Sequence, residues 1–362
     1  MRRNLSMMAP RPSTEIPAGL LAVGEQVSAC IDSLLEAELG RWSRVDPDLA
    51  APIDSLAALV RAGGKRLRPA FCHWAYVGAG GDPADKAVVH AGAALELLHT
   101  FALVHDDVMD GSLTRRGLPA VHRQFMATQE RNGWVGESRR FGEGAAILIG
   151  DFAFVWSDLL LGDVTPSVRA VFDELRIELC VGQYLDLAAA ARGANDLERA
   201  ARIERYKSGK YTVERPLHLG AALAGRFDEL APHFSAFGVP LGEAFQLRDD
   251  LLAIFGDAET IGKPVGDDLR EGKRTPLIAM AAERASGAEQ ALIARLGAPD
   301  LSDDEVQALT DLLDRCGARA AIEARIDTLV EESLAALAAA PITDEARTAL
   351  TELGEYVAWR DR

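Results

Sequence analysis

Residues 93–107 read AALELLHTFALVHDD, and this stretch decides the fold class. Its apolar residues return at intervals of three and four, which is the period of an amphipathic α-helix. The same period appears in VFDELRIELCVGQYLDLAA (171–189) and in ARAAIEARIDTLVEESLAALAAA (318–340). Long alternating stretches rich in Val, Ile, Thr and Tyr, which would indicate a sheet, are absent from the sequence. The sequence therefore predicts an all-α protein built as a helical bundle.

The 362-residue chain is long enough for two domains, at about 150 residues per domain. No shift in composition and no repeat of fixed period marks a boundary, so we expect one domain over residues 21–362. Residues 1–20 are interrupted by prolines, and we expect them to form a flexible tail. Residues 127–144, rich in glycine and charge, are expected to form a loop between two helices of the domain.

The charge balance limits the classes of partner. The chain has 39 Lys and Arg against 55 Asp and Glu, a net charge of -16, so its overall field repels nucleic acid and anionic membranes. The 4 cysteines are scattered and form no C-x-x-C motif, which favours a reduced protein of the cytoplasm. No signal peptide is expected, and no uninterrupted apolar run approaches the roughly 18 residues of a membrane span. We therefore expect a polyanionic partner to bind only at a local basic site.

The first acidic cluster follows the apolar stretch directly. Asp106, Asp107 and Asp110 lie in LVHDDVMDGS, and the i, i+4 spacing puts Asp106 and Asp110 on one helix face. Such a cluster can be a solvated acidic cap at a helix end. It can also hold Mg²⁺, which takes one or two carboxylates and bridges to phosphate oxygens.

A second acidic pair and two basic segments favour the metal interpretation. Asp249 and Asp250 lie in another apolar helical segment, FQLRDDLLAIFGD. Two short basic stretches, GGKRLRP (63–69) and TRRG (114–117), stand out in an acidic chain. An isolated basic turn is usually only solvated, but arginine offers a fixed fork of donors that fits phosphate oxygens. Together the acidic and basic clusters predict a site for a diphosphate bridged by Mg²⁺.

Four segments in this order and spacing resemble the trans-isoprenyl diphosphate synthases, and most closely bacterial short-chain members such as the geranylgeranyl diphosphate synthases. The resemblance spans roughly residues 50 to 285. The segments are GGKRLRP (63–69), LLHTFALVHDDVMDGSLTRRG (97–117), YKSGKYTVERP (206–216) and FQLRDDLLAIFGDAETIGKPVGDDLREGKRTPL (245–277).

The resemblance implies an isoprenoid-synthase bundle whose central cavity is lined by two aspartate-rich helices. It also implies a head-to-tail condensation of isopentenyl diphosphate with an allylic diphosphate, with about three Mg²⁺ ions per site. The implied metal ligands are Asp106, Asp110, Asp249 and Asp250. The implied catalytic residues are Asp106, Asp107, Asp110, Lys207, Ser208, Gln246, Asp249 and Lys273.

The resemblance further implies two cationic clamps and a homodimer. The allylic diphosphate would be held by Arg115, Lys207 and Lys273. The isopentenyl diphosphate would be held by Lys65, Arg68, His99 and Arg116, and its hydrocarbon group would lie near Phe245 and Gln246. Without the resemblance, His99 would be interpreted as a core histidine, and Lys207 and Lys273 as solvated surface charges.

The chain departs from the family pattern at two positions. Ala253 stands where many relatives have the third aspartate of the second motif. This leaves Asp249 and Asp250 to bind metal there, with Asp268 in an indirect role. Ser208 replaces a usual threonine, so the hydroxyl is kept and a methyl is lost.

Product length is predicted from the residues one turn before the first aspartates. Ala102 is small and lies on nearly the same helix face as Asp106, whereas Phe101 is bulky. This combination resembles the geranylgeranyl synthases and favours a C20 product, with C15 and C25 or longer products as alternatives. A class I terpene cyclase and a non-catalytic synthase subunit are the remaining rival functions.

Overall fold

Helix α4 (Lys86–Asp110) contains the stretch that decides the fold class. All residues from 91 to 98 are buried, on every side of the helix. Burial on all sides is expected of a helix in the interior of a bundle. Its main contacts are with α6 (Ser138–Leu161), α3 (Leu67–Gly78) and α1 (Ala18–Trp42). The acidic cluster at the end of α4 is therefore fixed by a rigid, enclosed helix.

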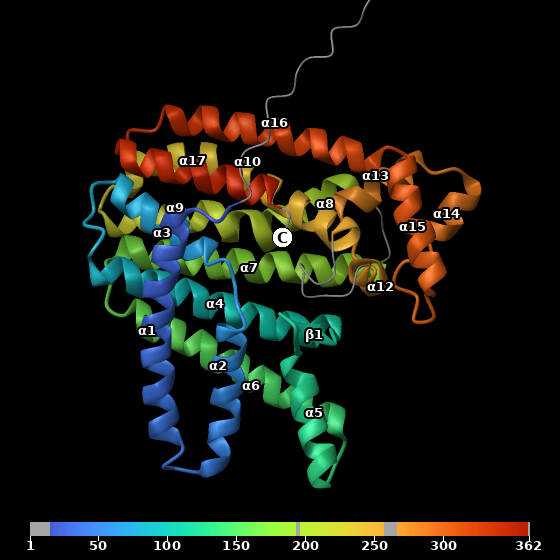
Figure 1. Ribbon diagram of the computed structural model, residues 1–362, viewed down its shortest axis with the longest axis horizontal. Helices are drawn as coiled ribbons and strands as arrows, with labels where there is room; N and C mark the ends of the chain where they lie inside the picture. The colour runs from blue at the N-terminus through green and yellow to red at the C-terminus, as the bar shows by residue number, and fades with distance from the viewer. Residues whose placement is uncertain (1–14, 193–195, 257–265, 361–362) are drawn as a thin grey trace, which may run out of the picture.

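The computed structural model describes residues 15–192, 196–256 and 266–360. In these residues the only sheet is an antiparallel pair of two-residue strands, β1 (Thr114–Arg115) and β2 (Leu118–Pro119), and the all-α prediction is confirmed (Figure 1). The remaining elements are η1 (Pro47–Leu49), α2 (Ala50–Arg61), α5 (Val121–Asn132), α7 (Pro166–Arg192), α8 (Leu197–Glu204), η2 (Arg205–Glu214), α9 (Arg215–Leu223), α10 (Phe227–Phe255), α12 (Asp267–Glu271), α13 (Pro276–Arg284), α14 (Gly287–Ile293), α15 (Asp303–Arg315), α16 (Ala318–Ala338) and α17 (Asp344–Trp359).

The bundle packs its C-terminal helices on elements from earlier in the chain. Helix α10 packs mainly on α16 and η2, and α17 packs on α3. In Figure 1, α16 and α17 run along one side of the bundle, and the end of the chain lies near its middle. A residue at the C-terminus can therefore reach the same interior as residues of α4 and α10.

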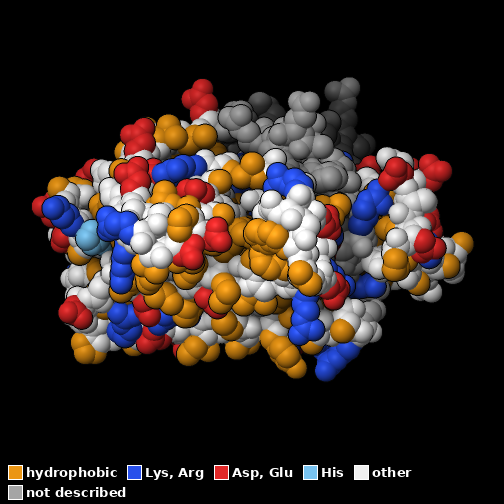
Figure 2. Space-filling model, turned by 90° about the horizontal axis from the view of Figure 1, so that it is seen from below, with side chains coloured by type: hydrophobic (Ala, Val, Ile, Leu, Met, Phe, Trp, Pro, Cys, Tyr) orange, Lys and Arg blue, Asp and Glu red, His pale blue; other side chains and the backbone are white. Residues whose placement is uncertain are grey.

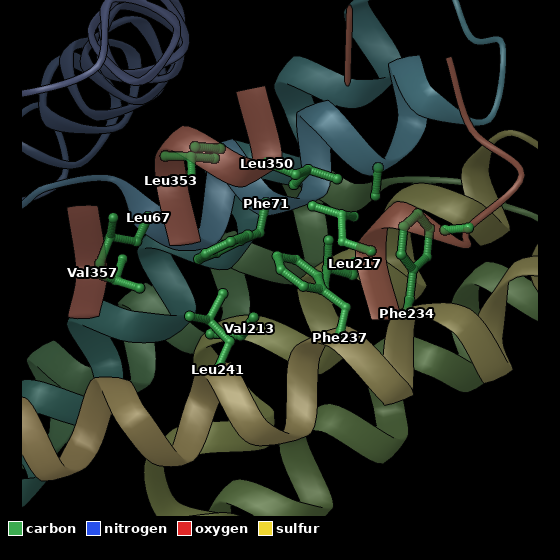
Figure 3. Packing of buried hydrophobic residues seen from close by; sticks show 14 of the residues in the cluster. Leu67, Phe71, Val213, Leu217, Phe234, Phe237, Leu241, Leu350, Leu353 and Val357 are labelled. Carbon is green, nitrogen blue, oxygen red and sulfur yellow. The ribbon is translucent and has the colours of Figure 1, made fainter. Parts of the chain in front are cut away.

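The core beside this interior is apolar and tightly filled. Phe71 of α3 lies beside Phe237 of α10, and Phe234 of α10 and leucines of α9 and α17 belong to the same cluster (Figure 3). All three phenylalanines are fully buried, and burying each such side chain stabilises the fold by about 1.5–3 kcal/mol. This core fixes α10, the second aspartate-bearing helix, against α3, which begins with the basic turn.

Two predicted boundaries differ from the structure. The loop expected at 127–144 is wrong, because α5 continues to Asn132 and α6 begins at Ser138. The real connection contains Gly133 and Gly136, both with positive φ, so the chain reverses within a few residues. Residues 1–14 of the expected tail lie outside the described residues, and residues 18–20 belong to α1.

The expectation that no segment could span a membrane is not confirmed. By length and composition alone, α1, α4 and α6 would each suffice for a span. In α4, 61% of the apolar window is buried inside the protein. The apolar character of α4 is therefore accounted for by its position in the bundle interior.

Close packing of α3 on α9 depends on Gly220. A Cβ at this position would lie 2.2 Å from the Cys72 carbonyl oxygen and 2.8 Å from the Tyr76 nitrogen, both rigid backbone atoms. We predict that Gly220→Ala lowers the free energy of unfolding by about 1–3 kcal/mol, because the helices must separate. Gly40→Ala is the control, since an added Cβ there meets nothing within 4 Å and should stabilise α1 by up to about 1 kcal/mol. Denaturant unfolding measures both, and equal effects would contradict the packing argument.

Candidate active site

One cavity of about 530 Å³ brings together residues from distant parts of the chain. Helix α4 contributes Asp106, and α10 contributes Asp249 and Asp250, so both aspartate-bearing helices reach it. The two acidic clusters thus share one space, as the sequence predicted. The predicted site residues that line it are Lys65, Arg68, His99, Ala102, Asp106, Arg115, Arg116, Lys207, Ser208, Phe245, Gln246, Asp249, Asp250 and Lys273.

Three predicted residues are not part of the cavity lining. Asp107 is 1% exposed and accepts a hydrogen bond from Arg115 Nε at 2.9 Å. It therefore fixes the position of Arg115 without lining the cavity itself. Asp110 lies at the end of α4, one turn beyond Asp106. Phe101 packs against Phe154, with ring centroids 4.9 Å apart, inside the neighbouring core.

Asp106 is surrounded by donors. Lys207 Nζ and Gln183 Nε2 each lie 3.0 Å from its Oδ1, and Arg115 Nη2 lies 3.2 Å from its Oδ2. Burial alone would raise the pKa of Asp106, but the cations Lys207, Arg115 and Lys273 lower it well below its ordinary range. Asp106 is therefore a fixed negative charge at neutral pH.

Asp110 behaves differently although it lies on the same helix. Burial, followed by repulsion from Asp106, raises the pKa of Asp110 to about 7. Its Oδ2 is buried and has no hydrogen-bond partner. A cation between the two carboxylates would remove the repulsion from Asp106 and give Oδ2 of Asp110 a partner.

The second acidic pair also divides into two environments. Asp249 Oδ1 accepts a hydrogen bond from Arg360, a buried residue at the end of the chain. Asp250 Oδ1 accepts one from Gln246 Nε2 at 2.8 Å, and Asp250 also faces the carboxyl of Glu204. Burial is the main reason that the pKa of Asp250 rises to about 7.

The basic turn at residues 63–69 is held in an unusual backbone conformation. Gly63 and Gly64 have φ of 117° and 149°, and Arg66 has φ of 51°, a left-handed conformation uncommon for arginine. A Cβ on Gly64 would come within 2.7 Å of Arg116 Nη2, so glycine permits the two basic segments to approach. Arg66 pairs with buried Glu96, which fixes the turn on α4.

Arg68 and Arg116, which line the cavity near the basic turn, act electrostatically on His99. Arg68 donates to Thr212 Oγ1 at 2.8 Å and stacks on the Tyr211 ring at 4.3 Å. Burial, and then the charges of Arg68 and Arg116, lower the pKa of His99 well below its ordinary range. The ring is therefore neutral, and it has a buried Nδ1 without a partner. A neutral imidazole among arginines can donate one hydrogen bond to an anion.

Lys207 enters the cavity from η2, a π-helical segment. π-Helical turns displace side chains from the α-helical register and are frequent at functional sites. η2 also lies very close to α7, because a Cβ on Gly182 would come within 2.3 Å of the Lys207 nitrogen. Lys207 Nζ binds Asp186 Oδ2 at 2.6 Å as well as Asp106. The lysine is therefore held between α4 and α7.

Lys273 approaches from the other side, after α12. Its Nζ lies 2.9 Å from Asp268 Oδ1 and 2.8 Å from Glu271 Oε2. Despite burial, these carboxylates raise the pKa of Lys273 well above its ordinary value, so it remains charged.

Several cavity residues were missed by the sequence analysis. Gln183 and Asp186 lie three residues apart on α7, and their polar character within an apolar helical segment was an available signal. Glu204 and Arg360 carried no such signal, because neither lies within a recognisable motif. Their positions follow only from the packing of α8 and α17.

The donor set of the cavity suits Mg²⁺ together with phosphate oxygens. Oδ2 atoms of Asp110 and Asp250 are buried without partners, and hard carboxylate oxygens are the ligands that Mg²⁺ prefers. Within the described ranges, no three His, Cys, Asp or Glu side chains converge into a ready-made metal site. Asp106 and Asp249 pair instead with lysine or arginine. The residues therefore fit metal ions that bind together with an anion. The anion would pair with the lysine and arginine side chains that the carboxylates release when they bind metal.

Comparison with known proteins agrees with this chemistry. The polyprenyl synthetase family model matches residues 52–313. The chain is 31% identical to geranylfarnesyl diphosphate synthase of Aeropyrum pernix, over 83% of this chain and 92% of that protein. It is 32% identical to geranylgeranyl diphosphate synthase of Methanosarcina mazei, over 84% and 88%.

A solved structure has the same fold. Geranylgeranyl pyrophosphate synthase from Corynebacterium glutamicum, in complex with isoprenyl diphosphate and magnesium, has a TM-score of 0.85 and 34% identity. The match covers 96% of this chain and 99% of that chain. With the family model spanning well over half of the sequence, the chain belongs to the polyprenyl synthetase family.

Proposed function

We propose that this prenyltransferase condenses isopentenyl diphosphate with an allylic diphosphate (dimethylallyl, geranyl or farnesyl) and that its product is geranylgeranyl diphosphate. The observation that carries the proposal is the single cavity in which both aspartate-bearing helices meet two sets of cations. Farnesyl diphosphate and longer products remain the alternatives for chain length.

Metal binding is assigned to Asp106 and Asp110 of α4 and to Asp249 and Asp250 of α10. The family is Mg²⁺-dependent, and we propose three ions per site. Mg²⁺, when bound, neutralises negative charge that develops on the leaving diphosphate. Because the site carboxylates lie on two helices, they can hold ions on two sides of one diphosphate.

The allylic diphosphate is assigned to Arg115, Lys207 and Lys273. Each of these cations already binds carboxylates of the cavity, so each is positioned and charged before the substrate arrives. The isopentenyl diphosphate is assigned to the other wall. That wall consists of Lys65, Arg68, His99 and Arg116. Two anions bound side by side need two separate cationic clamps.

The bond changes follow from this arrangement. The carbon–oxygen bond of the allylic substrate breaks, its diphosphate leaves, and the isopentenyl double bond attacks the resulting allylic cation. This attack forms the new carbon–carbon bond and leaves a tertiary cation on the isopentenyl unit. Loss of a proton from the adjacent carbon to the departed diphosphate then restores a double bond. Phe245 and Gln246 line the cavity, and a ring face and an amide oxygen stabilise positive charge where water is excluded. Catalytic support from Asp107 is indirect, through Arg115, and Ser208 supplies a hydroxyl beside Lys207.

Loss of Asp106 should stop the reaction without unfolding the protein. In Asp106→Ala, Lys207 keeps Asp186 and Arg115 keeps Asp107, so the thermal midpoint should stay nearly unchanged. Turnover of isopentenyl and allylic diphosphates should fall about 100-fold or more. Asp54→Ala, at an exposed position of α2, is the control and should retain full activity.

The same assay, run with Mg²⁺ and labelled isopentenyl diphosphate, separates the rival functions. Elongated prenyl diphosphate supports the proposal. A cyclised hydrocarbon would indicate a terpene cyclase, and no turnover by the wild-type chain would indicate a non-catalytic subunit. Normal turnover by Asp106→Ala would contradict the assignment of the metal site.

Chain length is assigned to the apolar end of the cavity near Ala102. The small side chain of Ala102 leaves room there, and Phe101 fills the adjacent core by contact with Phe154. We predict that Phe101→Ala opens this core and lengthens the product, because removing a phenyl ring leaves a void. Chromatography of the reaction products measures the shift, and an unchanged distribution would contradict the role of Phe101.

We also propose that the enzyme is a cytoplasmic homodimer whose interface is formed by α6 and α7. Most of the large apolar side chains that are exposed in the described residues belong to these two helices. Asp158 of α6 pairs with Arg169 and Arg176 of α7, so the helices lie together. On the face seen in Figure 2, apolar side chains gather around the centre. The exposed apolar residues of the two helices are Phe141, Ile147, Leu148, Val155, Leu159, Ile177, Val181, Tyr184 and Leu187.

A second copy of the chain suits this surface because its spacing is regular. Leu148, Val155 and Leu159 follow one another by seven and four residues, which places them on one face of α6. Ile177, Val181 and Tyr184 follow one another by four and three residues, so they share one face of α7. An apolar face of this kind on a soluble enzyme marks an interaction site, and a two-fold axis would pair it with itself.

Charged substitutions on this face should separate the subunits. We predict that wild-type protein sediments at twice the 38.9 kDa chain mass and that Leu148→Glu with Leu159→Glu sediments at the chain mass. Val45→Glu, at another exposed apolar position, should leave the dimer intact. A wild-type monomer, or wild-type protein that binds lipid vesicles through this face, would contradict the dimer.

A further inference from the structure

Glu204 is a buried carboxyl in the cavity wall that the proposed reaction does not use. It is the last residue of α8, immediately before η2, and it is 8% exposed. It lines the same cavity as Asp249 and Asp250. Both of its carboxylate oxygens are buried, and no N–H or hydroxyl group of the described residues donates to them. Its polar neighbour is the carboxyl of Asp250, with which it forms a carboxyl–carboxylate hydrogen bond, and no N–H or hydroxyl group in the described part of the chain donates to Oδ2 of Asp250.

This arrangement is costly unless a ligand completes it. A buried carboxyl normally accepts several hydrogen bonds or pairs with a cation. Glu204 instead faces Asp250, and the charges of Glu243 and Asp186 lie nearby. Glu204 and Asp250 line one cavity, and both oxygens of Glu204 and Oδ2 of Asp250 receive no hydrogen bond from an N–H or hydroxyl group within the described ranges. Neighbouring carboxylate oxygens of this kind have the ligand chemistry of a divalent cation site.

The two aspartate-bearing helices differ in a way that Glu204 compensates. On α4, Asp106 is followed one turn later by Asp110, which provides two carboxylates on one face. On α10, Asp249 is followed one turn later by Ala253, which lines the cavity with a side chain that has no oxygen. One turn after its first aspartate, α10 therefore lacks the carboxylate that α4 carries at the corresponding position. Glu204 brings a carboxylate to the α10 side of the cavity from a different helix.

We propose that Glu204 is a metal-binding residue that supplies the third carboxylate of the α10 site, beside Asp249 and Asp250. The proposal rests on the proposed function, since the ion enters together with a diphosphate. Asp249 must exchange Arg360 for the ion when the site fills. Glu204 and Asp250 line the same cavity and have no lysine or arginine partner to exchange among the residues that the structure describes.

The test is a titration of the purified protein with Mn²⁺ in the presence of inorganic pyrophosphate, with free Mn²⁺ followed by electron paramagnetic resonance. We expect Glu204→Gln to weaken the affinity of one class of Mn²⁺ sites by about 10-fold to 100-fold. Glu243→Gln is the matched control. Glu243 acts electrostatically on Glu204 but lies outside the cavity lining and pairs with Arg325 at 2.9 Å. It should therefore keep wild-type affinity.

A second variant distinguishes a lost ligand from a disturbed fold. Ala253→Asp restores a carboxylate one turn after Asp249, so Glu204→Gln with Ala253→Asp should regain most of the lost affinity. Affinity in Glu204→Gln equal to that of wild type would overturn the inference, as would a loss that Ala253→Asp fails to recover. A wild-type protein that binds no Mn²⁺ with pyrophosphate and forms no product would instead overturn the proposed function.

Discussion

The structure depends on pairing opposite charges around one cavity. Isolated carboxylates or guanidinium groups would be too costly to bury, whereas paired charges with hydrogen bonds can be tolerated. Asp106 is therefore held by Lys207 and Arg115, and Asp249 by Arg360. These pairs join α4 to η2 and α10 to the end of α17. Helices far apart in the sequence are thus fixed around the space where the chemistry is proposed.

The same pairs explain how the cavity can accept both cations and anions. A lysine or arginine that pairs with a carboxylate in this structure can bind a phosphate instead, once a divalent ion has replaced it as the partner of that carboxylate. Lys207 already lies between Asp106 and Asp186, so it can give up one carboxylate and keep the other. The cations consequently remain charged and positioned throughout such an exchange. This is a form of preorganisation, because the reacting groups need little movement.

Helix periodicity made most of the fold predictable from sequence. The segments at 93–107, 171–189 and 318–338 are helical, and Asp106 of α4 lines the same cavity as Asp249 and Asp250 of α10. The predicted loop at 127–144 is wrong because its glycines and charged residues also occupy the ends of two helices. In the structure these residues end one helix and begin another, and the turn itself is confined to 133–137. Local composition therefore predicted that the chain turns, but overestimated the length of the connection.

The site was predictable only where its residues lie close together in sequence. Asp106 and Asp110 are recognisable because one helical turn separates them, whereas Arg360 reaches Asp249 from 111 positions along the chain. Phe101 was predictable in position but not in orientation. Its place beside Ala102 in the sequence does not reveal that its ring packs into the core against Phe154. At Ala253 the second motif lacks a carboxylate, and the consequence of that absence can be judged only when the position of α8 is known. Glu204 lies in the wall of the same cavity. The number of carboxylates available to bind metal is therefore set by all the helices that line the cavity and cannot be read from one motif.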